Sequence, residues 1–362
     1  MTGRRGKHGL PTLTGVNLCC FSLGDAFCVA ASIADTVLIS TSLGVLTTCV
    51  IGGGGFIGQA VCVALLERGR NVVIVGRENT APAELAARVR YFRNEPGLNE
   101  AVLRQALSLA DEVIDLAYAT VPGTSFQDPI NDILVNLPEA VRLFELASEF
   151  ALRKFVWVSS GGTVYGRTRA ERIAESHPTQ PLSPYGITKL AIEKYAHMYF
   201  ESRALPIVCV RPSNAFGPGQ RVYAGQGFVA TAIASVLDAR EITLFGEHGT
   251  VRDYLHVADM ARGIVAALEH GQAGEVYNIG SEVGLSNRQV LDALAPLAAA
   301  AGLALRVRAA APRPFDVPTN VLDCGRLRTV SGWRPGRTFT EGLADTWAWY
   351  VAHYRAAAPP IA

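Results

Sequence analysis

Val50-Ile51-Gly52-Gly53-Gly54-Gly55-Phe56-Ile57-Gly58 joins two segments of different hydrophobic pattern. The residues at 45–51 form an apolar run typical of a β-strand, and 56–67 has the spacing of an amphipathic helix. Glycines at G-x-x-G-x-x-G spacing let a strand turn directly into a helix, so that a pyrophosphate reaches backbone N–H groups at the helix N-terminus. The stretch therefore predicts a dinucleotide site, with a flexible glycine loop as the alternative. The predicted contact residues are Gly52, Gly55, Phe56, Ile57 and Gly58.

The charge of the chain is nearly balanced. Its 362 residues include 33 basic and 32 acidic ones, the net charge is +1, and no long basic run occurs. Nucleic acid is therefore not an expected partner. The seven cysteines form no C-x-x-C pair and no Cys/His spacing typical of zinc sites. We therefore expect no metal, and we expect buried thiols in a reducing compartment, the cytoplasm.

Two N-terminal features raise the question of a membrane span or an export signal. Residues 36–66 contain no charge, but the glycine cluster among them makes a poor spanning helix, so we expect a strand, a loop and a buried helix and no membrane partner. In residues 1–44, basic residues precede an apolar stretch at 16–33 that Asp25 interrupts, which loosely resembles a signal peptide. A disordered leader, or a start placed too far upstream, is the preferred explanation, because an exported protein would find little nicotinamide cofactor.

Strand-like and helix-like segments alternate from residue 45 onward. This alternation predicts an α/β fold of the Rossmann type, a doubly wound parallel sheet with helices on both faces. After residue 212 the pattern loosens, and we expect a smaller, discontinuous C-terminal substrate lobe. The expected strands are 45–51, 71–76, 112–117, 154–159 and 206–211. The expected helices are 56–69, 82–90, 99–110, 137–150, 184–202, 257–270, 286–301 and 340–354.

Domain boundaries follow from this pattern. We expect the cofactor-binding Rossmann domain to comprise residues 45–215 and 259–283, because the segment 259–282 is expected to return to the sheet. Residues 216–258 and 284–360 are then expected to form the lobe that binds the substrate. Residues 1–44 stay outside both domains.

The end of the second predicted strand bears on the choice of cofactor. In NAD-binding Rossmann units an acidic residue near this point binds the ribose hydroxyls, but here the strand runs into Gly76 and Arg77. A guanidinium at this place can pair with a 2′-phosphate, so Arg77 by itself favours NADP over NAD. The alternative is that Arg77 only covers the adenine face.

A tyrosine and a lysine four residues apart are candidates for catalysis. Tyr185 and Lys189 follow Pro184 at the start of a predicted helix and therefore project from one face. A free tyrosine has a pKa of about 10 and is a poor base at neutral pH, but a neighbouring ammonium and a positive nicotinamide would favour the phenolate. Tyr185 is thus a candidate acid/base for a sugar or alcohol hydroxyl, and Lys189 can also bind the nicotinamide ribose. A Tyr/Lys pair on a solvated helix is the alternative.

Over roughly residues 45–352, these motifs resemble the extended short-chain dehydrogenase/reductase superfamily. Within it the chain is most similar to the NAD-dependent epimerase/dehydratase family and its UDP-glucose 4-epimerase branch. The resemblance implies that Tyr185 is the catalytic base and that Lys189 is its partner. Besides the glycine loop and this pair, it rests on Ser-Ser-Gly-Gly-Thr-Val-Tyr-Gly at 159–166, Arg-Pro-Ser-Asn at 211–214, Val-Arg-Asp-Tyr-Leu-His-Val at 251–257, Tyr-Asn-Ile-Gly at 277–280, Arg-Pro-Phe-Asp at 313–316 and Thr-Trp-Ala-Trp at 346–349.

The resemblance also implies ligands for the substrate's diphosphate. Asn214, Arg252 and Arg313 match family positions that hold this group, and arginines on the outer lobe suit bidentate phosphate binding. The alternative for each arginine is a surface ion pair, which for Arg252 would involve its neighbour Asp253.

On the cofactor side, the resemblance implies NAD, whereas Arg77 favours NADP. Asn94 stands near the place where family members often have an adenine-contacting Asp. Ala117 belongs to Asp115-Leu116-Ala117-Tyr118, which stands where family members often have His-x-Ala-Ala. We therefore expect Asn94 and Ala117 to contact NAD or NADP.

The turn at 159–166 departs from the family pattern in a way that bears on the reaction. Family members usually have a Ser or Thr where this chain has Gly161, and that hydroxyl relays the proton between substrate and catalytic tyrosine. Thr163 or Ser160 can supply a hydroxyl instead, and Thr163 is preferred. Related dehydratases carry Asp-Glu at the positions of Gly162 and Thr163, and decarboxylases keep a Glu. Because this turn has no carboxylate, elimination and decarboxylation are disfavoured.

The resemblance therefore predicts a nucleotide-sugar epimerase that oxidises and re-reduces C4 of the sugar through a 4-keto intermediate. One alternative is an NADPH-dependent nucleotide-sugar 4-ketoreductase, and another is a non-catalytic NADP-binding regulatory protein. The expected substrate is UDP-linked, and Asn320, near the position that gates pocket size, is small enough to admit an N-acetylated sugar. A homodimer is expected through the helices at 137–150 and 184–202.

Overall fold

The computed structural model describes residues 44–94, 99–313 and 317–354. The predicted leader and most of the motif at 313–316 lie outside the described residues. Among the helices that are described, none is long and apolar enough to cross a membrane. The described cysteines are buried free thiols, as predicted, and the cysteines before residue 44 lie outside the described part: those described are Cys49, Cys62, Cys209 and Cys324.

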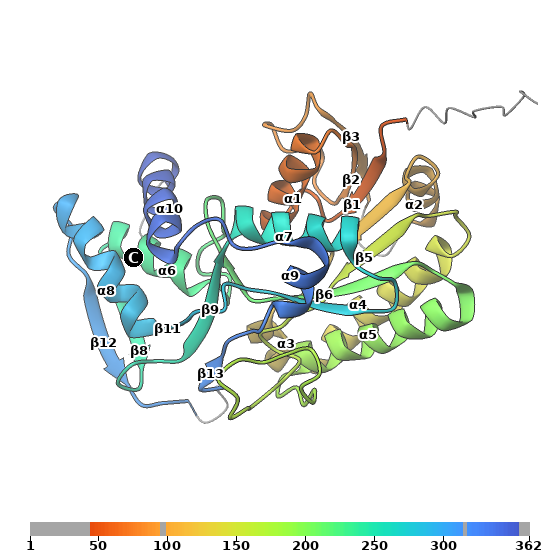
Figure 1. The fold of residues 1–362 in the computed structure, drawn as a ribbon. Coiled ribbons are helices and arrows are strands. Elements are labelled where there is room, and N and C mark those ends of the chain that lie inside the picture. The colour runs from red at the N-terminus through yellow and green to blue at the C-terminus, as the bar shows by residue number, and fades with distance from the viewer. Residues whose placement is uncertain (1–43, 95–98, 314–316, 355–362) are drawn as a thin grey trace, which may run out of the picture. The chain divides into compact units, whose positions relative to one another are not determined.

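Seven parallel strands form the main sheet in the order β10-β6-β5-β4-β1-β2-β3 (Figure 1). From β1 the chain builds the sheet first toward β2 and β3, and then on the opposite side through β4, β5 and β6. Such a reversal creates the crevice in which Rossmann-type sheets bind dinucleotides. The sheet confirms the predicted α/β fold. Its strands are β1 (Thr47–Ile51), β2 (Asn71–Gly76), β3 (Val89–Arg93), β4 (Glu112–Asp115), β5 (Lys154–Val158), β6 (Ile207–Pro212) and β10 (Val276–Ile279).

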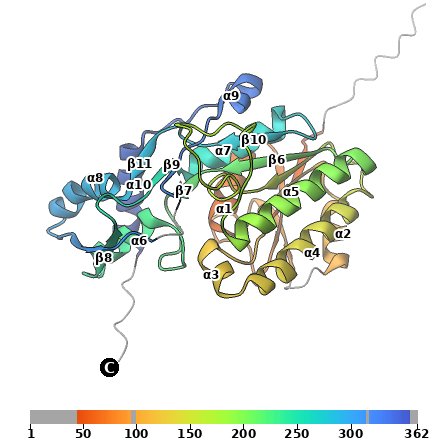
Figure 2. The ribbon, with the colours of Figure 1, turned by 90° about the horizontal axis from the view of Figure 1, so that it is seen from below.

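Helices cover both faces of this sheet (Figures 1 and 2). Side chains of α1 and α7 share one hydrophobic core, and side chains of α2, α4 and α5 share a second. In β1, Val50 belongs to the first core, whereas Cys49 and Ile51 belong to the second. Burial on both faces explains why the strand reads as one apolar run. The helices are α1 (Phe56–Glu67), α2 (Glu100–Leu107), α4 (Pro129–Ala147), α5 (Pro184–Arg203) and α7 (Val257–His270).

A third hydrophobic core is built by α6, α8 and α10 with parts of β8 and β9. Beside it, β9 pairs with β7, β11 and β13, and β8 pairs with β12. The predicted return of 259–282 to the main sheet is confirmed because β10 pairs with β6, while the division into domains stays a prediction. These elements are β7 (Asn214–Phe216), α6 (Phe228–Leu237), β8 (Glu241–Phe245), β9 (Val251–His256), β11 (Gly284–Ser286), α8 (Asn287–Ala300), β12 (Arg306–Ala310), β13 (Thr319–Asn320), α9 (Gly325–Ser331) and α10 (Phe339–His353).

The predicted helix 82–90 is wrong. The chain forms turns there and then enters β3, which pairs with β2 along its whole length. The alanines and Glu84 of this stretch favour a helix by intrinsic propensity. Val89, Tyr91 and Phe92 suit an edge strand, and pairing with β2 outweighs the local preference.

The predicted start of the helix at 137–150 is also wrong, because α4 begins at Pro129. Asp128 caps it, and its Oδ1 accepts a hydrogen bond from the Asn131 amide at 2.9 Å. Pro138 lies inside α4, and since proline is a poor residue for a helix interior, the pattern alone favours a start near it. A short helix, α3 (Pro122–Gln127), precedes α4 and was not predicted.

Candidate active site

The glycine loop after β1 forms a tight cradle that excludes side chains at Gly52 and Gly58. Gly52 has φ +79°, and a Cβ on it would lie 3.0 Å from the Ala117 amide nitrogen. A Cβ on Gly58 would lie 2.2 Å from the Gly52 carbonyl oxygen, so α1 can approach the loop only with glycine here. Helix α1 begins at Phe56, and its N-cap, Gly55, offers no side chain to the first amides. These amides are therefore available to a phosphate, and Ala117 borders the same loop.

Beyond the end of β2, an acidic residue that our sequence reading overlooked lies beside Arg77. The Glu78 Oε1 atom is 3.8 Å from Arg77 Nε and 3.9 Å from Arg221 Nη2. Glu78 directly follows Arg77, so its position in the sequence was the available signal. A carboxylate here suits ribose hydroxyls, whereas the guanidinium groups suit a phosphate.

Asn94 lies at the end of β3, next to the same strand end. Its amide donates to the Gly76 carbonyl oxygen at 2.8 Å, and its Oδ1 accepts from the Asn99 amide at 3.0 Å. The Asn94 side chain therefore stabilises the chain at the point where it enters α2. The proposed adenine contact of Asn94 stays a prediction.

The Tyr185/Lys189 pair is set by the start of α5. Ser183 is the N-cap, its Oγ accepts from the Gly186 amide at 3.1 Å, and Pro184 occupies the first turn. Lys189 is buried, and its Nζ donates to the Val158 carbonyl oxygen at 2.8 Å at the end of β5. The pair is thus anchored to the carboxyl edge of the sheet rather than placed on a solvated helix face.

Burial dominates the electrostatics of this pair. It lowers the pKa of Lys189, which the carboxylates of Asp115, Glu193 and Asp132 oppose. It raises the pKa of Tyr185, and a hydrogen-bonding interaction with the Ser160 side chain acts in the opposite direction. Without a bound cofactor, the Lys189 ammonium therefore does not offset the effect of burial, and the phenolate of Tyr185 is not favoured.

The missing hydroxyl at position 161 has a steric cause. A Cβ on Gly161 would lie 2.6 Å from Leu322 Cδ1 and 2.8 Å from the Arg211 carbonyl oxygen. Of the two candidate substitutes, Ser160 interacts with Tyr185, whereas Thr163 Oγ1 is buried without a hydrogen-bond partner in the described part of the chain. The effect of Ser160 on the pKa of Tyr185 favours Ser160, the reverse of the order expected from the sequence, and both roles stay predictions.

We expect Ser160→Ala to lower kcat by about tenfold to a hundredfold, the range for one hydrogen bond to a charged group. We expect Thr163→Val, which removes the other hydroxyl and keeps the side-chain volume, to change kcat less than about threefold. Steady-state kinetics of both variants with a nucleotide sugar tests the order. A larger loss in Thr163→Val would assign the relay to Thr163 instead.

Strand pairing brings Asn214 and Asn320 to the turn at 159–166. Asn214 Oδ1 would lie 3.6 Å from a Cβ on Gly162, and Asn320 Nδ2 donates to the Gly161 carbonyl oxygen at 3.1 Å. Asn320 is almost fully buried, yet its Oδ1 has no hydrogen-bond partner among the described residues. Asn320 pairs in register with Arg252, which extends this polar cluster along β9.

Arg313 lies in a different setting from Asn214 and Arg252. Its guanidinium carbon is 4.3 Å from the centre of the Phe245 ring, at the end of β8. The guanidinium of Arg252 donates to the Val251 carbonyl oxygen at 2.8 Å on β9. The diphosphate roles of Asn214, Arg252 and Arg313 stay predictions.

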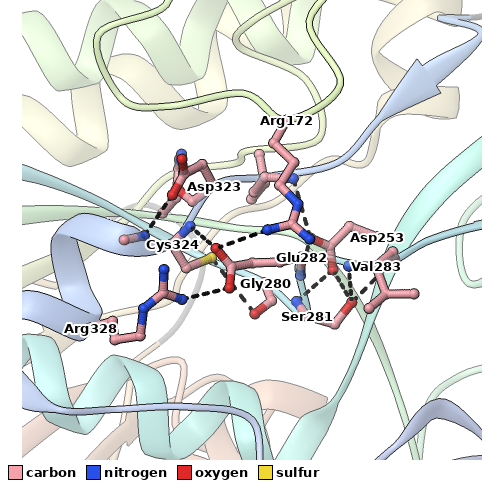
Figure 3. Close-up of polar contacts among 12 residues, drawn as sticks. Arg172, Asp253, Gly280, Ser281, Glu282, Val283, Asp323, Cys324 and Arg328 are labelled. Carbon is pink, nitrogen blue, oxygen red and sulfur yellow. Dashed lines mark hydrogen bonds and ion pairs between the residues drawn. The ribbon is translucent and has the colours of Figure 1, made fainter.

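The neighbour of Arg252, Asp253, makes a set of hydrogen bonds to other segments of the chain. The Asp253 carboxylate is fully buried and accepts hydrogen bonds from the Ser281 amide and hydroxyl, both at 2.7 Å (Figure 3). It also accepts from the amides of Glu282 and Leu322, each at 3.2 Å. Asp253 therefore links β9 to two other segments. One follows β10, and the other, which carries Leu322, follows β13.

We expect Asp253→Ala to lower the free energy of unfolding by about 2–4 kcal/mol, because it leaves several buried donors without a partner. Asp345→Ala is the matched control, since this aspartate is exposed and its Oδ2 contacts Arg337 at 3.5 Å. Urea unfolding measures both. Equal stability of Asp253→Ala and the control would contradict the structural role of Asp253.

Comparison with known proteins agrees with this geometry. The model of the "NAD dependent epimerase/dehydratase family" matches residues 48–280. UDP-glucose 4-epimerase of Mycolicibacterium smegmatis is 34% identical, over 83% of this chain and 97% of that protein. A dTDP-glucose 4,6-dehydratase of Actinoplanes is 29% identical, over 84% of this chain and 97% of that protein.

Solved structures give the same result. Thermus thermophilus UDP-glucose 4-epimerase, a complex with NAD, has a TM-score of 0.76 at 33% identity and covers 85% of this chain and 100% of its own. Thermotoga maritima UDP-glucose 4-epimerase with UDP-glucose has a TM-score of 0.78 at 29% identity and covers 85% of this chain and 99% of its own. The chain therefore belongs to the NAD-dependent epimerase/dehydratase family of enzymes, within the extended short-chain dehydrogenase/reductase superfamily.

Proposed function

We propose that the chain is a nucleotide-sugar 4-epimerase acting on a UDP-linked hexose. The observation that carries the proposal is the pair of half-buried Tyr185 and buried Lys189, anchored at the carboxyl edge of the sheet that also carries the glycine loop. The similarity to UDP-glucose 4-epimerases supports the substrate class. A nucleotide-sugar dehydratase is the related activity, and the turn at 159–166 lacks the carboxylate that elimination would need.

The chain's own residues supply proton transfer and orientation. Tyr185 accepts the proton of the sugar's C4 hydroxyl and later returns it, and Ser160 relays it where the two oxygens do not meet directly. The Lys189 ammonium stabilises the phenolate and binds the nicotinamide ribose. Arg252, Asn214 and Arg313 hold the diphosphate, so that the 4-keto sugar turns while the nucleotide stays fixed.

NAD is the cofactor that the site supports best. A Cβ at position 58 would collide with the loop. Because Gly58 has no Cβ, α1 approaches the loop closely, and the cradle fits a pyrophosphate. Bound NAD supplies the acceptor and donor of the C4 hydride, and its positive ring favours the Tyr185 phenolate that burial disfavours. Glu78 suits the ribose hydroxyls, and Arg77 lies beside its carboxylate. Relatives in this fold bind NAD, as in the Thermus enzyme.

An NADPH-dependent 4-ketoreductase is the second candidate, favoured by Arg77 and Arg221 near one carboxylate oxygen. A 2′-phosphate could bind the two guanidinium groups in place of Glu78. The two candidates differ in cofactor retention, since an epimerase leaves its cofactor unchanged and has no need to release it. We also propose a cytoplasmic location for the protein, whether it acts as the epimerase or as the ketoreductase.

Two finer features of the epimerase are also proposals. We propose that Asn320, whose side chain is smaller than that of tyrosine and donates to the Gly161 carbonyl oxygen, admits an N-acetylated sugar. A homodimer would form through α4 and α5, which pack on each other and expose apolar side chains. Covering such a surface favours association. The exposed large apolar side chains on these helices are Ile130, Ile133, Leu134, Ile187, Tyr195 and Met198.

The proposed function is tested by two observations on purified protein. Mass spectrometry after denaturation identifies any cofactor that survives purification, and incubation with UDP-sugars reveals a 4-epimer. Retained NAD together with epimer formation is the expected result. A protein that consumes NADPH and releases a reduced sugar would overturn the epimerase in favour of the ketoreductase.

A further inference from the structure

One aromatic ring contacts both members of the candidate catalytic pair. The Tyr118 ring centre lies 4.0 Å from Lys189 Nζ, within the range of a strong cation–π interaction. The same ring meets the Tyr185 ring edge to face, with centroids 4.9 Å apart. The Trp157 ring also lies next to Lys189, and its centre is 4.7 Å from Lys189 Nζ. Lys189 is thus enclosed by aromatic faces and a backbone carbonyl rather than by a directly paired carboxylate.

We propose that Tyr118 is a positioning residue, whose ring keeps the Lys189 ammonium charged and in place beside Tyr185. In its relation to turnover, this inference rests on the proposed function. The chain carries Tyr118 within Asp115-Leu116-Ala117-Tyr118, one residue beyond the alanine that borders the glycine loop. No role was assigned to Tyr118 from the sequence.

The two residues that follow Tyr118 are held by hydrogen bonds to α4. The Ala119 amide donates to Asn136 Oδ1 at 2.8 Å, and the Thr120 hydroxyl donates to the Asp132 carboxylate. Asp132 is buried on α4 and also accepts from Thr188 Oγ1 at 2.6 Å, one residue before Lys189. One buried carboxylate therefore couples the Tyr118 segment to α5, so the ring has little freedom to leave Lys189.

The ring rather than the hydroxyl of Tyr118 carries the inference. Tyr118 Oη is buried and makes no well-formed hydrogen bond among the described residues, although the Thr188 and Thr120 side chains oppose the rise that burial causes in the pKa of Tyr118. Tyr118→Phe therefore keeps the cation–π face and the contact with Tyr185, and it removes a hydroxyl that makes no well-formed hydrogen bond. Tyr118→Met fills much of the same space without an aromatic face.

The charge on Lys189 is the quantity that the ring affects. Burial lowers the pKa of Lys189, and the charged groups that oppose this are Asp115 at the end of β4, Asp132 on α4 and Glu193 on α5. An aromatic face stabilises the ammonium but not the neutral amine. Loss of the Tyr118 ring should thus lower the pKa of Lys189 further, and the phenolate of Tyr185 should become less favourable at neutral pH.

The experiment is a pH titration of lysine side-chain nitrogens by NMR in protein labelled at lysine. The chain has few lysines, at 7, 154, 189 and 194, and Lys189→Arg assigns the resonance. We expect the Lys189 pKa to fall by about half to one and a half pH units in Tyr118→Met and to stay unchanged in Tyr118→Phe. The resonance of Lys194, on the same helix, serves as the internal reference. Circular dichroism confirms that each variant is folded.

Turnover gives the second readout. With a UDP-sugar, we expect kcat of Tyr118→Met to fall at neutral pH and KM to change little, with Tyr118→Phe near the parent. An unchanged Lys189 titration in Tyr118→Met would overturn the inference, as would a Tyr118→Phe protein that behaves like Tyr118→Met. The titration needs no turnover, so a shift confined to Tyr118→Met in an inactive protein supports this inference while the proposed function fails.

Discussion

Replacing Tyr185 with phenylalanine is expected to lower kcat by about a thousandfold or more while the cofactor stays bound. The substitution removes only the hydroxyl that accepts and returns the C4 proton, and general acid–base groups contribute roughly 10²–10⁴ in rate. The ring contacts of Tyr185 with Tyr118 remain available to phenylalanine. Steady-state kinetics and mass spectrometry of the released cofactor measure the two effects.

Tyr195→Phe is the matched control for Tyr185→Phe. It makes the same chemical change on the same helix at a partly exposed position, and we expect activity close to that of the parent chain. Turnover that persists in Tyr185→Phe at the level of the control would remove Tyr185 from the mechanism.

Replacing Gly58 with alanine is expected to weaken NAD binding at least about a hundredfold. The new Cβ would lie 2.2 Å from the Gly52 carbonyl oxygen and 2.7 Å from Gly53 Cα, so α1 must move away from the loop. Loss of two hydrogen bonds from amides to a charged phosphate accounts for this factor. Calorimetric titration of cofactor-free protein with NAD measures it.

Gly54→Ala controls for the added methyl group in the same loop. A Cβ on Gly54 would meet nothing within 4 Å, so we expect the affinity for NAD to change less than about threefold. Thermal unfolding of both variants separates weaker binding from general destabilisation. Equal affinity in Gly58→Ala and Gly54→Ala would show that the close approach of α1 is not what forms the cofactor site.

The central strands of the sheet were predictable because they are buried on both faces. In β1 neighbouring residues enter different cores, so the apolar run and the glycines after it mark both the strand and the turn. The segment 82–90 failed because its alanines favour a helix, while pairing with β2 depends on residues far away in the sequence. The intrinsic preference of a short segment gives no information about a strand partner that is distant in the sequence.

The candidate site was predictable in its motifs and less so in its contacts. Tyr185 and Lys189 follow from spacing, but the ring of Tyr118 on Lys189 depends on how the loop after β4 folds over α5. Likewise, the sequence shows only that Gly161 lacks the hydroxyl that family members usually have at this position. Only the structure shows that Leu322, 161 residues further along the chain, fills the space beside it.

The most direct test of the proposed 4-epimerase follows deuterium at C4 of the sugar. The purified chain is incubated with UDP-glucose deuterated at C4, and the UDP-sugars are analysed by NMR and mass spectrometry. We predict a 4-epimer that keeps its deuterium at C4, without label in added free NADH, because the hydride returns from the same bound cofactor. An epimer that has lost the deuterium, or a product formed only with consumption of NADPH, would contradict transfer through a tightly held cofactor and a 4-keto intermediate.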